Sequence, residues 1–282
     1  MKNRLPRVPS KYRPRLTRRG RLVLIAGAVV AVATAVLVPL LLAGEPPAGE
    51  KKTVSLLVPE GRRATQVYAS VDEVLDVAPG TTEKAATATR LELPGAARRN
   101  PEGYLFPATY PVEAGATPGG LLGYMVDTAQ ERFGADRVTA GARRNGVSVY
   151  QTVTIASIVQ AEADTPADMG RVARVVHNRL ARDMPLQMDS TLNYALNRST
   201  LDTTHSDTKT ASPYNTYESR GLPPTPIGNP GEEAMNAAIN PPRGDWLYFV
   251  TVAAGDTRFT ADYAEHQRNV AEFNANRSAA ED

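Results

Sequence analysis

Residues 153–162 read VTIASIVQAE, and this stretch places one carboxylate on an apolar helical face. Ile155, Ile158 and Val159 recur at the spacing of a single helix face, and Glu162 falls on that face one turn later. Burial disfavours the charged form of a carboxylate and raises its pKa, which is what a general acid needs near neutral pH. The alternative is that the helix ends here, so that Glu162 reaches solvent.

The composition bounds the fold and the kinds of site that the chain can carry. A chain of 282 residues that is 42% hydrophobic can bury a core in one or two domains. The absence of cysteine excludes disulfides, thiol catalysis and cysteine-ligated zinc. His177, His205 and His266 are too far apart for a metal cluster, and a trio such as Asp202, His205 and Asp207 in a polar loop is usually solvated. We expect no metal ion and no other cofactor.

The N-terminal region predicts a membrane anchor. Residues 1–21 carry nine Lys or Arg side chains and no acidic one, and residues 22–43 form an uncharged apolar run, LVLIAGAVVAVATAVLVPLLLA. At about 1.5 Å per residue, a helix of this length crosses a hydrocarbon core of about 30 Å. Because the basic flank precedes the run, we expect a single-pass helix in the cell membrane. Its N-terminus would be cytoplasmic, with a linker at 44–52 and an extracytoplasmic remainder.

Two other interpretations of this region are weaker. A cleaved signal peptide has an apolar region of about 7–15 residues, which is shorter than this run. A nucleic-acid-binding arm would need stacking side chains, but the basic segment has a single tyrosine, Tyr12, and several prolines. We therefore expect the lipid bilayer, bound through residues 22–43, and no nucleic acid as the partner of this region.

Hydrophobic periodicity and turn residues predict an α+β fold after the linker. Strands are expected at 54–58 and 246–253, the second paired with 257–260. Thr165 is expected to cap a helix that begins at Pro166. The expected helices are about 64–77, 117–133, 150–163, 166–180, 231–239 and 266–273, with a frayed tail at 274–282. Residues 186–191 are expected to lead into another short helix that ends at about 196. The folded part then divides into 53–146 and 147–273.

A polar, proline-rich loop follows these helices. Residues 212–217 read SPYNTY, and residues 221–230 read GLPPTPIGNP. Proline removes backbone freedom without forming a helix or strand, so two tyrosines, an asparagine and a threonine stand on a stiffened loop. Tyrosine rings stack on sugars, and amides and hydroxyls bond to sugar hydroxyls and acetamides, which suits a polysaccharide cleft. The alternative is a purely structural loop.

Seven motifs in a fixed order carry a resemblance to a known family. They are PEGYLFPATY at 101–110, ASIVQAEA at 156–163, HNRL at 177–180, LQMDST at 186–191, SPYNTY at 212–217, GLPPTPIGNP at 221–230 and LYFV at 247–250. In this order they resemble the YceG-like endolytic murein transglycosylases over residues 53–273. Any one motif would be weak, but the order of several independent motifs makes the resemblance specific.

The resemblance implies a membrane-anchored lytic transglycosylase that cuts nascent peptidoglycan strands between N-acetylmuramic acid and N-acetylglucosamine. Cleavage would leave 1,6-anhydro ends and terminate strand elongation. The resemblance also implies a reduced LysM-like α/β subdomain within 53–146 and a YceG-like catalytic domain at 147–273. Peptidoglycan strands and peptidoglycan synthases are the implied partners. The family's essential glutamate corresponds to Glu162; many members carry an acid and a lysine just before it, where this chain has Gln160 and Ala161.

The expected catalytic residue is Glu162, acting first as acid and then as base while the muramyl C6 hydroxyl closes the anhydro ring. The expected substrate-binding residues are Gln187, Asp189, Thr191, Tyr214, Asn215, Thr216, Tyr217, Gly221, Pro223 and Pro224. Two rival functions stay open. One is a hydrolytic muramidase with Asp164, Asp168 or Asp189 as second carboxylate. The other is a non-catalytic wall-binding scaffold of the elongation or division machinery.

Overall fold

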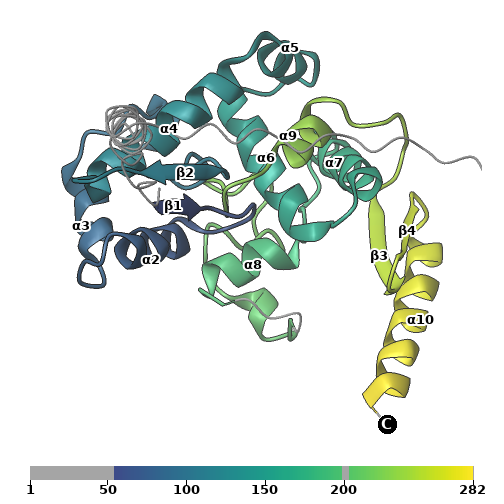
Figure 1. Cartoon of the computed structure of the whole chain (residues 1–282). Coiled ribbons are helices and arrows are strands. Elements are labelled where there is room, and N and C mark those ends of the chain that lie inside the picture. The colour runs from purple at the N-terminus through teal and green to yellow at the C-terminus, as the bar shows by residue number, and fades with distance from the viewer. Residues whose placement is uncertain (1–53, 199–202, 282) are drawn as a thin grey trace, which may run out of the picture. The chain divides into compact units, whose positions relative to one another are not determined.

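The computed structural model describes residues 54–198 and 203–281, so the basic segment and the apolar run at 22–43 lie outside the described residues. Thr53–Asp282 forms one compact unit by itself. Helices predominate in this unit, and two small antiparallel sheets lie at separate places in it (Figure 1). Within the described ranges, no helix is both long and apolar enough to cross a membrane. The α+β prediction is confirmed for this unit.

The first sheet closes a strand–helix–helix–strand segment. Its two strands pair antiparallel, with Leu57 opposite Thr109. The elements are β1 Val54–Leu57, α2 Ala64–Val74, α3 Thr81–Ala88 and β2 Thr109–Val112. The PEGYLFP motif leads into β2, and its Tyr104, Leu105 and Phe106 are buried. The motif therefore fastens this segment to the core.

Helices α4 to α9 form the body of the unit, and the β3–β4 hairpin and α10 follow (Figure 1). The hairpin strands pair antiparallel, with Tyr248 opposite Thr260. The bounds are α4 Pro118–Gly134, α5 Asp136–Arg144, α6 Val149–Glu162, α7 Pro166–Ala181, α8 Asp189–Ala195, α9 Glu232–Ile239, β3 Tyr248–Ala253, β4 Asp256–Thr260 and α10 Tyr263–Glu281. The predictions for α4, α6, α7 and α9 are confirmed to within one residue at each end, and α8 ends within one residue of its predicted end.

Four helices differ from the sequence prediction. Helix α2 ends three residues before the expected position 77, and α3 lies in a stretch for which the sequence predicts no helix. Hydrophobic periodicity does not reveal α5, because only three of its residues are buried. The expectation of a frayed tail at 274–282 is wrong, since α10 continues to Glu281. Its later turns are fastened to the hairpin, where Asn276 Nδ2 donates to the carbonyl of Val252 at 2.9 Å. A tertiary contact, which local sequence does not encode, accompanies the extension.

Helix α6 is the element that positions the candidate acid. Its start is a capping box, in which the Ser148 hydroxyl accepts the Gln151 N–H at 3.1 Å and Gln151 Oε1 accepts the Ser148 N–H at 2.8 Å. Every residue from Thr152 to Val159 is buried. The predicted apolar stripe is thus one side of a helix that is enclosed all round, and the helix ends at Glu162.

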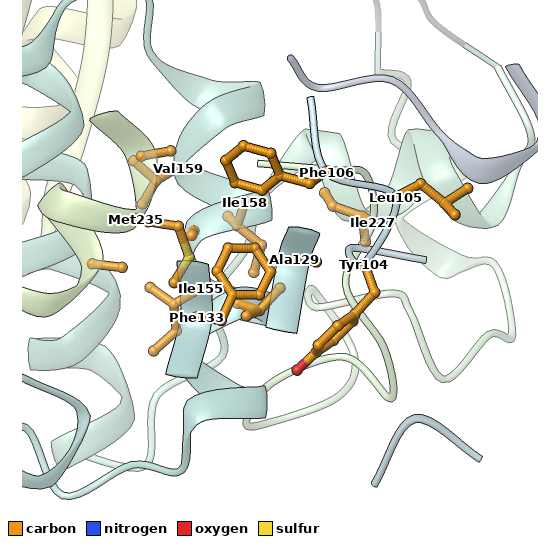
Figure 2. Packing of buried hydrophobic residues seen from close by; sticks show 14 of the residues in the cluster. Tyr104, Leu105, Phe106, Ala129, Phe133, Ile155, Ile158, Val159, Ile227 and Met235 are labelled. Carbon is orange, nitrogen blue, oxygen red and sulfur yellow. The ribbon is translucent and has the colours of Figure 1, made fainter. Parts of the chain in front are cut away.

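The hydrophobic core joins the two halves of the unit around α6 (Figure 2). Ile158 of α6 lies near Met235 of α9 in this view. Tyr104 and Phe106 of the PEGYLFP motif pack edge-on against Phe133 of α4, with ring centroids 5.6 and 5.9 Å apart. One buried cluster therefore includes residues on both sides of the predicted boundary at 146.

Candidate active site

Glu162 stands at the C-terminal end of α6, where the chain turns towards α7. The helix stops because Ala163 adopts an extended backbone, with φ of −147°, and the next helix begins at Pro166. Thr165 caps that next helix as predicted, accepting the N–H of Asp168. The Glu162 side chain is nevertheless half-buried. The helix therefore ends at Glu162, as one alternative supposed, but its carboxyl is still partly buried.

A backbone group holds the Glu162 carboxylate. The N–H of Ser190, in the first turn of α8, donates to Oε1 of Glu162 at 3.2 Å. Burial raises the pKa of Glu162 above its ordinary value, the bond from Ser190 opposes the rise, and the Asp189 carboxylate adds to it. Glu162 therefore keeps its proton to a higher pH than an exposed glutamate, which suits a general acid.

Asp189 and Tyr217 form the neighbouring pair. The Tyr217 hydroxyl donates to Asp189 Oδ1 at 2.6 Å. Burial raises the pKa of Tyr217, and the negative charges of Asp189 and Glu162 raise it further. Two residues predicted from separate motifs thus share one electrostatic environment with the candidate acid.

Loop 212–217 is fastened to segment 187–191 by its inward-facing groups. The carbonyl of Thr216 accepts the Gln187 N–H at 3.0 Å. The Thr216 hydroxyl accepts the Met188 N–H at 3.0 Å and lies 2.8 Å from the Thr191 hydroxyl. Both threonines are buried. Their side chains position the two segments relative to each other and are not displayed to solvent.

Asn215 also faces inward. Its Nδ2 donates to the carbonyls of Thr208 and Thr210, each at 2.9 Å, and its Oδ1 accepts the Tyr217 N–H at 3.0 Å. The side chain is fully buried. The sequence predicts a displayed amide at this position, whereas the structure uses the amide to shape the loop that carries Tyr217.

Gln187 is exposed beside this network and has a positive φ of 52°. Such a backbone is uncommon outside glycine and occurs often at functional sites. Its Oε1 accepts a bond from Arg179 Nη1 at 3.1 Å, and the buried Arg179 also donates to the carbonyl of Leu247 at 2.6 Å. Sequence reasoning missed Arg179, although it lies seven residues after Val172 on the buried face of α7. A polar residue on a buried face is the same signal that identified Glu162.

The remaining predicted contacts lie around a separate cavity. Gly221, Pro223 and Pro224 line a cavity of about 660 Å³ that does not include Glu162. Tyr214 stands beside it, with its hydroxyl 3.0 Å from the Thr225 hydroxyl at the cavity wall. The structure therefore divides the predicted substrate contacts between the surroundings of Glu162 and this second location.

Glu102 is a buried carboxylate that sequence reasoning did not single out, although it lies within the aromatic motif PEGYLFP. Its Oε1 accepts the N–H of Ala64, the first residue of α2, at 2.9 Å, and its Oε2 accepts the Tyr194 hydroxyl at 3.0 Å. Burial raises the pKa of Glu102 to about 7, and these two bonds and the charge of Arg63 oppose the rise. Glu102 thus joins α2 to α8, the helix whose first turn holds Glu162.

The other acidic candidates have different surroundings. Asp164 is exposed, and Asp168 accepts the Thr165 hydroxyl at 3.0 Å in the cap of α7. Of the three suggested second carboxylates, Asp189 is the one that acts on the pKa of Glu162. In the described part of the chain, no three His, Asp or Glu side chains are grouped to hold a metal ion. Asp207 pairs with Arg198 at 2.7 Å, and Asp202 lies outside the described residues.

Comparisons with known proteins identify relatives of this chain. The model of the YceG-like family matches residues 33–272. An endolytic murein transglycosylase of Bacillus subtilis (strain 168) is 38% identical over 168 residues, which are 59% of this chain and 46% of that protein. One from Streptococcus pneumoniae serotype 2 (strain D39) is 36% identical over 182 residues, which are 62% of this chain and 33% of that protein. The chain therefore spans less than half the length of these two relatives.

A solved structure resembles the fold. The crystal structure of a YceG-like protein from Listeria monocytogenes matches with a TM-score of 0.66 and 30% sequence identity. The match covers 77% of this chain and 75% of that chain.

Proposed function

The chain belongs to the YceG-like family, and from that membership we propose that it is an endolytic lytic transglycosylase of peptidoglycan. Relatives in Bacillus and Streptococcus carry the name endolytic murein transglycosylase. The half-buried Glu162 carboxyl, with its raised pKa and its bond from Ser190, is the observation that carries the assignment. The reaction needs one positioned carboxyl that keeps its proton near neutral pH.

In this mechanism Glu162 serves both proton transfers. It donates its proton to the glycosidic oxygen as the bond to C1 of the muramic acid breaks, and the N-acetylglucosamine leaves with that proton as a hydroxyl. The carboxylate then takes the proton of the C6 hydroxyl of the same muramic acid, while that oxygen bonds to C1 and closes the 1,6-anhydro ring. No water is consumed, and Glu162 ends protonated. The acetamide oxygen can assist the departure.

The predicted substrate residues take three proposed roles. The accessible side chains near Glu162, namely Gln187, Asp189 and Tyr217, contact the glycan directly. The buried side chains of Thr191, Asn215 and Thr216 hold the segments that carry those contacts. Tyr214, Gly221, Pro223 and Pro224 shape the wall further along.

A hydrolytic muramidase is the second candidate, and the position of Asp189 favours it. Its carboxylate lies close enough to Glu162 to raise the pKa of that acid. In a two-carboxylate mechanism, Asp189 would activate a water molecule or attack C1 while Glu162 protonates the leaving oxygen. The product would then have a free reducing end in place of an anhydro ring.

Digestion of purified sacculi and of nascent strands by the full chain separates these functions. The transglycosylase releases fragments with 1,6-anhydro ends, and the muramidase releases fragments with reducing ends. A wall-binding scaffold produces no new ends. Glu162→Gln must abolish the product, and anhydro ends that persist in this variant would refute the assignment of Glu162.

We extend the proposal to the membrane. Residues 22–43 would form a single-pass anchor with a cytoplasmic N-terminus and an extracytoplasmic catalytic domain, supported by the length of the run and the basic residues before it. A peptidoglycan synthase that supplies nascent strands is the protein partner that this location implies. Protease added to intact, wall-stripped cells should remove residues 55–282 and spare an N-terminal tag. A protected C-terminus would contradict this topology.

The segment 53–146 is proposed as a reduced LysM-like subdomain. Its order of β1, α2, α3 and β2, with the two strands paired antiparallel, supports this assignment. Residues 147–273 are proposed as the catalytic domain, since they contain Glu162 and the groups around it. Retention of the Glu162→Gln protein on sacculi, with and without changes to exposed residues of α2 and α3, would test glycan binding by the subdomain.

A further inference from the structure

The cavity beside the N-terminal half of α6 has no part in the proposed chemistry. It is lined by Tyr150, Gln151 and Thr154 of α6, by residues 96–98 and 100, and by loop 221–225. Thr154 precedes Glu162 by eight residues, which is about 12 Å along a helix. The volume of about 660 Å³ falls within the range of roughly 300–1,000 Å³ typical of ligand sites. The cavity is therefore large enough for a separate group of the same substrate.

The lining combines an apolar wall with a single positive charge. Val147, Leu180 and Leu222 contribute alkyl surface, and Arg98 is the one charged residue among the described residues that line the cavity. Asn100 and the residues from α6 add amide and hydroxyl groups. Such a lining suits a ligand that has small alkyl groups, amide groups and one anionic group.

Arg98 is available for a ligand. Its guanidinium has no hydrogen bond or ion pair with any other side chain or carbonyl in residues 54–198 and 203–281, and the side chain is exposed. Its φ of 48° and the φ of 69° at Arg99 place two successive arginines in the left-handed region. Backbone of this kind is disfavoured in residues other than glycine and is found often at ligand sites. Arg99 is fastened through its bond to the carbonyl of Thr87 at 3.1 Å.

Tyr150 provides a second observation at the same place. Its hydroxyl is buried and has no hydrogen-bond partner within the described residues. Burial raises the pKa of Tyr150, Tyr214 adds to the rise, and the charge of Arg98 opposes it, so the guanidinium lies within electrostatic range of the hydroxyl. A buried polar group that lacks a hydrogen-bond partner costs free energy, and a bound ligand can supply that partner.

We propose that this cavity binds the carboxylate-bearing peptide branch of the peptidoglycan strand, with Arg98 as the contact to the carboxylate. The inference rests on the proposed function. The sugars of an intact strand are uncharged because the lactyl carboxyl of the muramic acid is in amide linkage, whereas the short peptides carry carboxylates beside small alkyl side chains. Tyr214 joins the two locations, since its hydroxyl lies 3.0 Å from Thr225 at the cavity and its loop is tied through Thr216 to residues 187–191.

Cleavage of two matched substrates tests the inference. Strands with intact peptides are compared with strands stripped by an amidase that cuts the bond between the lactyl group and the peptide. The full chain in detergent is expected to cleave intact strands roughly tenfold faster than stripped strands. Arg98→Gln should lose this advantage and cleave stripped strands at the original rate. Arg98→Lys should keep most of the advantage, and Arg143→Gln, a change at an exposed arginine of α5, should alter neither rate.

If Arg98→Gln lowers the cleavage rates of intact and stripped strands equally, or lowers neither, the peptide assignment is overturned. The transglycosylase assignment stays intact in both cases. If the protein cleaves neither substrate, the proposed function fails, and binding decides the inference independently. Calorimetric titration with N-acetylmuramyl-L-alanyl-D-isoglutamine should then give a Kd about tenfold weaker for Arg98→Gln than for the unchanged chain. Equal Kd values, or no binding to either protein, would overturn it.

Discussion

Ser190 donates its backbone N–H to the Glu162 carboxylate at 3.2 Å, across 28 positions of sequence. The residue before it, Asp189, raises the pKa of the same carboxyl through its charge, while the bond from Ser190 lowers it. The first turn of α8 thus orients the Glu162 carboxyl. It also contains one residue that raises the pKa of Glu162 and one that lowers it. Tyr217 holds Asp189 in place at 2.6 Å.

Glu162→Gln should abolish glycan cleavage and leave the protein folded. The amide keeps the shape of the side chain but has no proton to transfer, so the rate should fall at least about 10²-fold. Because the pKa of Glu162 is raised, its contribution to stability is full at low pH and is lost as the pH rises. The variant should therefore gain in Tm relative to the unchanged protein as the pH rises above the ordinary range of a glutamate pKa.

Glu131→Gln, at an exposed position of α4, is the matched control and should change neither cleavage nor Tm. Release of anhydro fragments and calorimetric Tm are the two measurements. A fall of many degrees in the Glu162→Gln variant would show that the carboxylate is a structural partner.

Asp189→Asn should shift the alkaline limb of the cleavage profile to lower pH. The carboxylate of Asp189 raises the pKa of Glu162, so its removal lets Glu162 lose its proton at a lower pH. Asp164→Asn, at an exposed position, should leave the profile unchanged. The products add a second result, because a transglycosylase keeps its anhydro ends in the Asp189→Asn variant, whereas a muramidase that uses this carboxylate loses its activity. An unshifted limb would contradict the electrostatic role of Asp189.

Asn215→Ala should lower stability more than Tyr214→Phe. The first change removes the buried amide that joins the carbonyls of Thr208 and Thr210 to the N–H of Tyr217, at about 1–3 kcal/mol for each group left unsatisfied. The second removes one hydroxyl bond, worth about 0.5–1.5 kcal/mol. Urea unfolding measures both. Equal midpoints for the two variants would mean that Asn215 does not hold the loop.

Glu102→Gln should make stability less dependent on pH. The pKa of Glu102 is raised from 4.5 to about 7, so the stabilisation from this group is full below the ordinary value and is lost as the pH rises to about 7. The amide has no such loss, and the variant should gain about 1–3 kcal/mol relative to the unchanged protein between acidic and mildly alkaline pH. Tm measured against pH checks this, with Glu73→Gln on exposed α2 surface as control. If the curves of Tm against pH run parallel for Glu102→Gln and the unchanged protein, the raised pKa of Glu102 is refuted.

Gly103→Ala should destabilise the protein far more than Gly115→Ala. Both glycines have left-handed backbone, with φ of 83° and 84°, so both substitutions share a cost of about 1–2 kcal/mol. A Cβ at position 103 would lie 2.5 Å from Pro226, whereas the space around position 115 is open. The clash adds about 1–3 kcal/mol at position 103 alone. Denaturant midpoints of the two variants measure the difference, and equal midpoints would show that the loop yields without cost.

Local sequence was sufficient for the helices around the candidate acid. The capping box at Ser148, the cap and proline at Thr165 and Pro166, and the apolar spacing that led to Glu162 all act within a few residues. Helix periodicity and capping are short-range effects, so the bounds of α6 and α7 follow from the sequence. The same logic, applied to α7, would have identified Arg179.

Only the tertiary structure decided what surrounds Glu162. The bond from Ser190, the pairing of Asp189 with Tyr217, the inward turn of Asn215 and the burial of Glu102 between α2 and α8 all join segments that are far apart in sequence. Burial, hydrogen-bond partners and neighbouring charges determine a pKa, and each depends on how such segments pack. The sequence by itself determined which residue is the candidate acid, and packing decided which groups hold it and how tightly it keeps its proton.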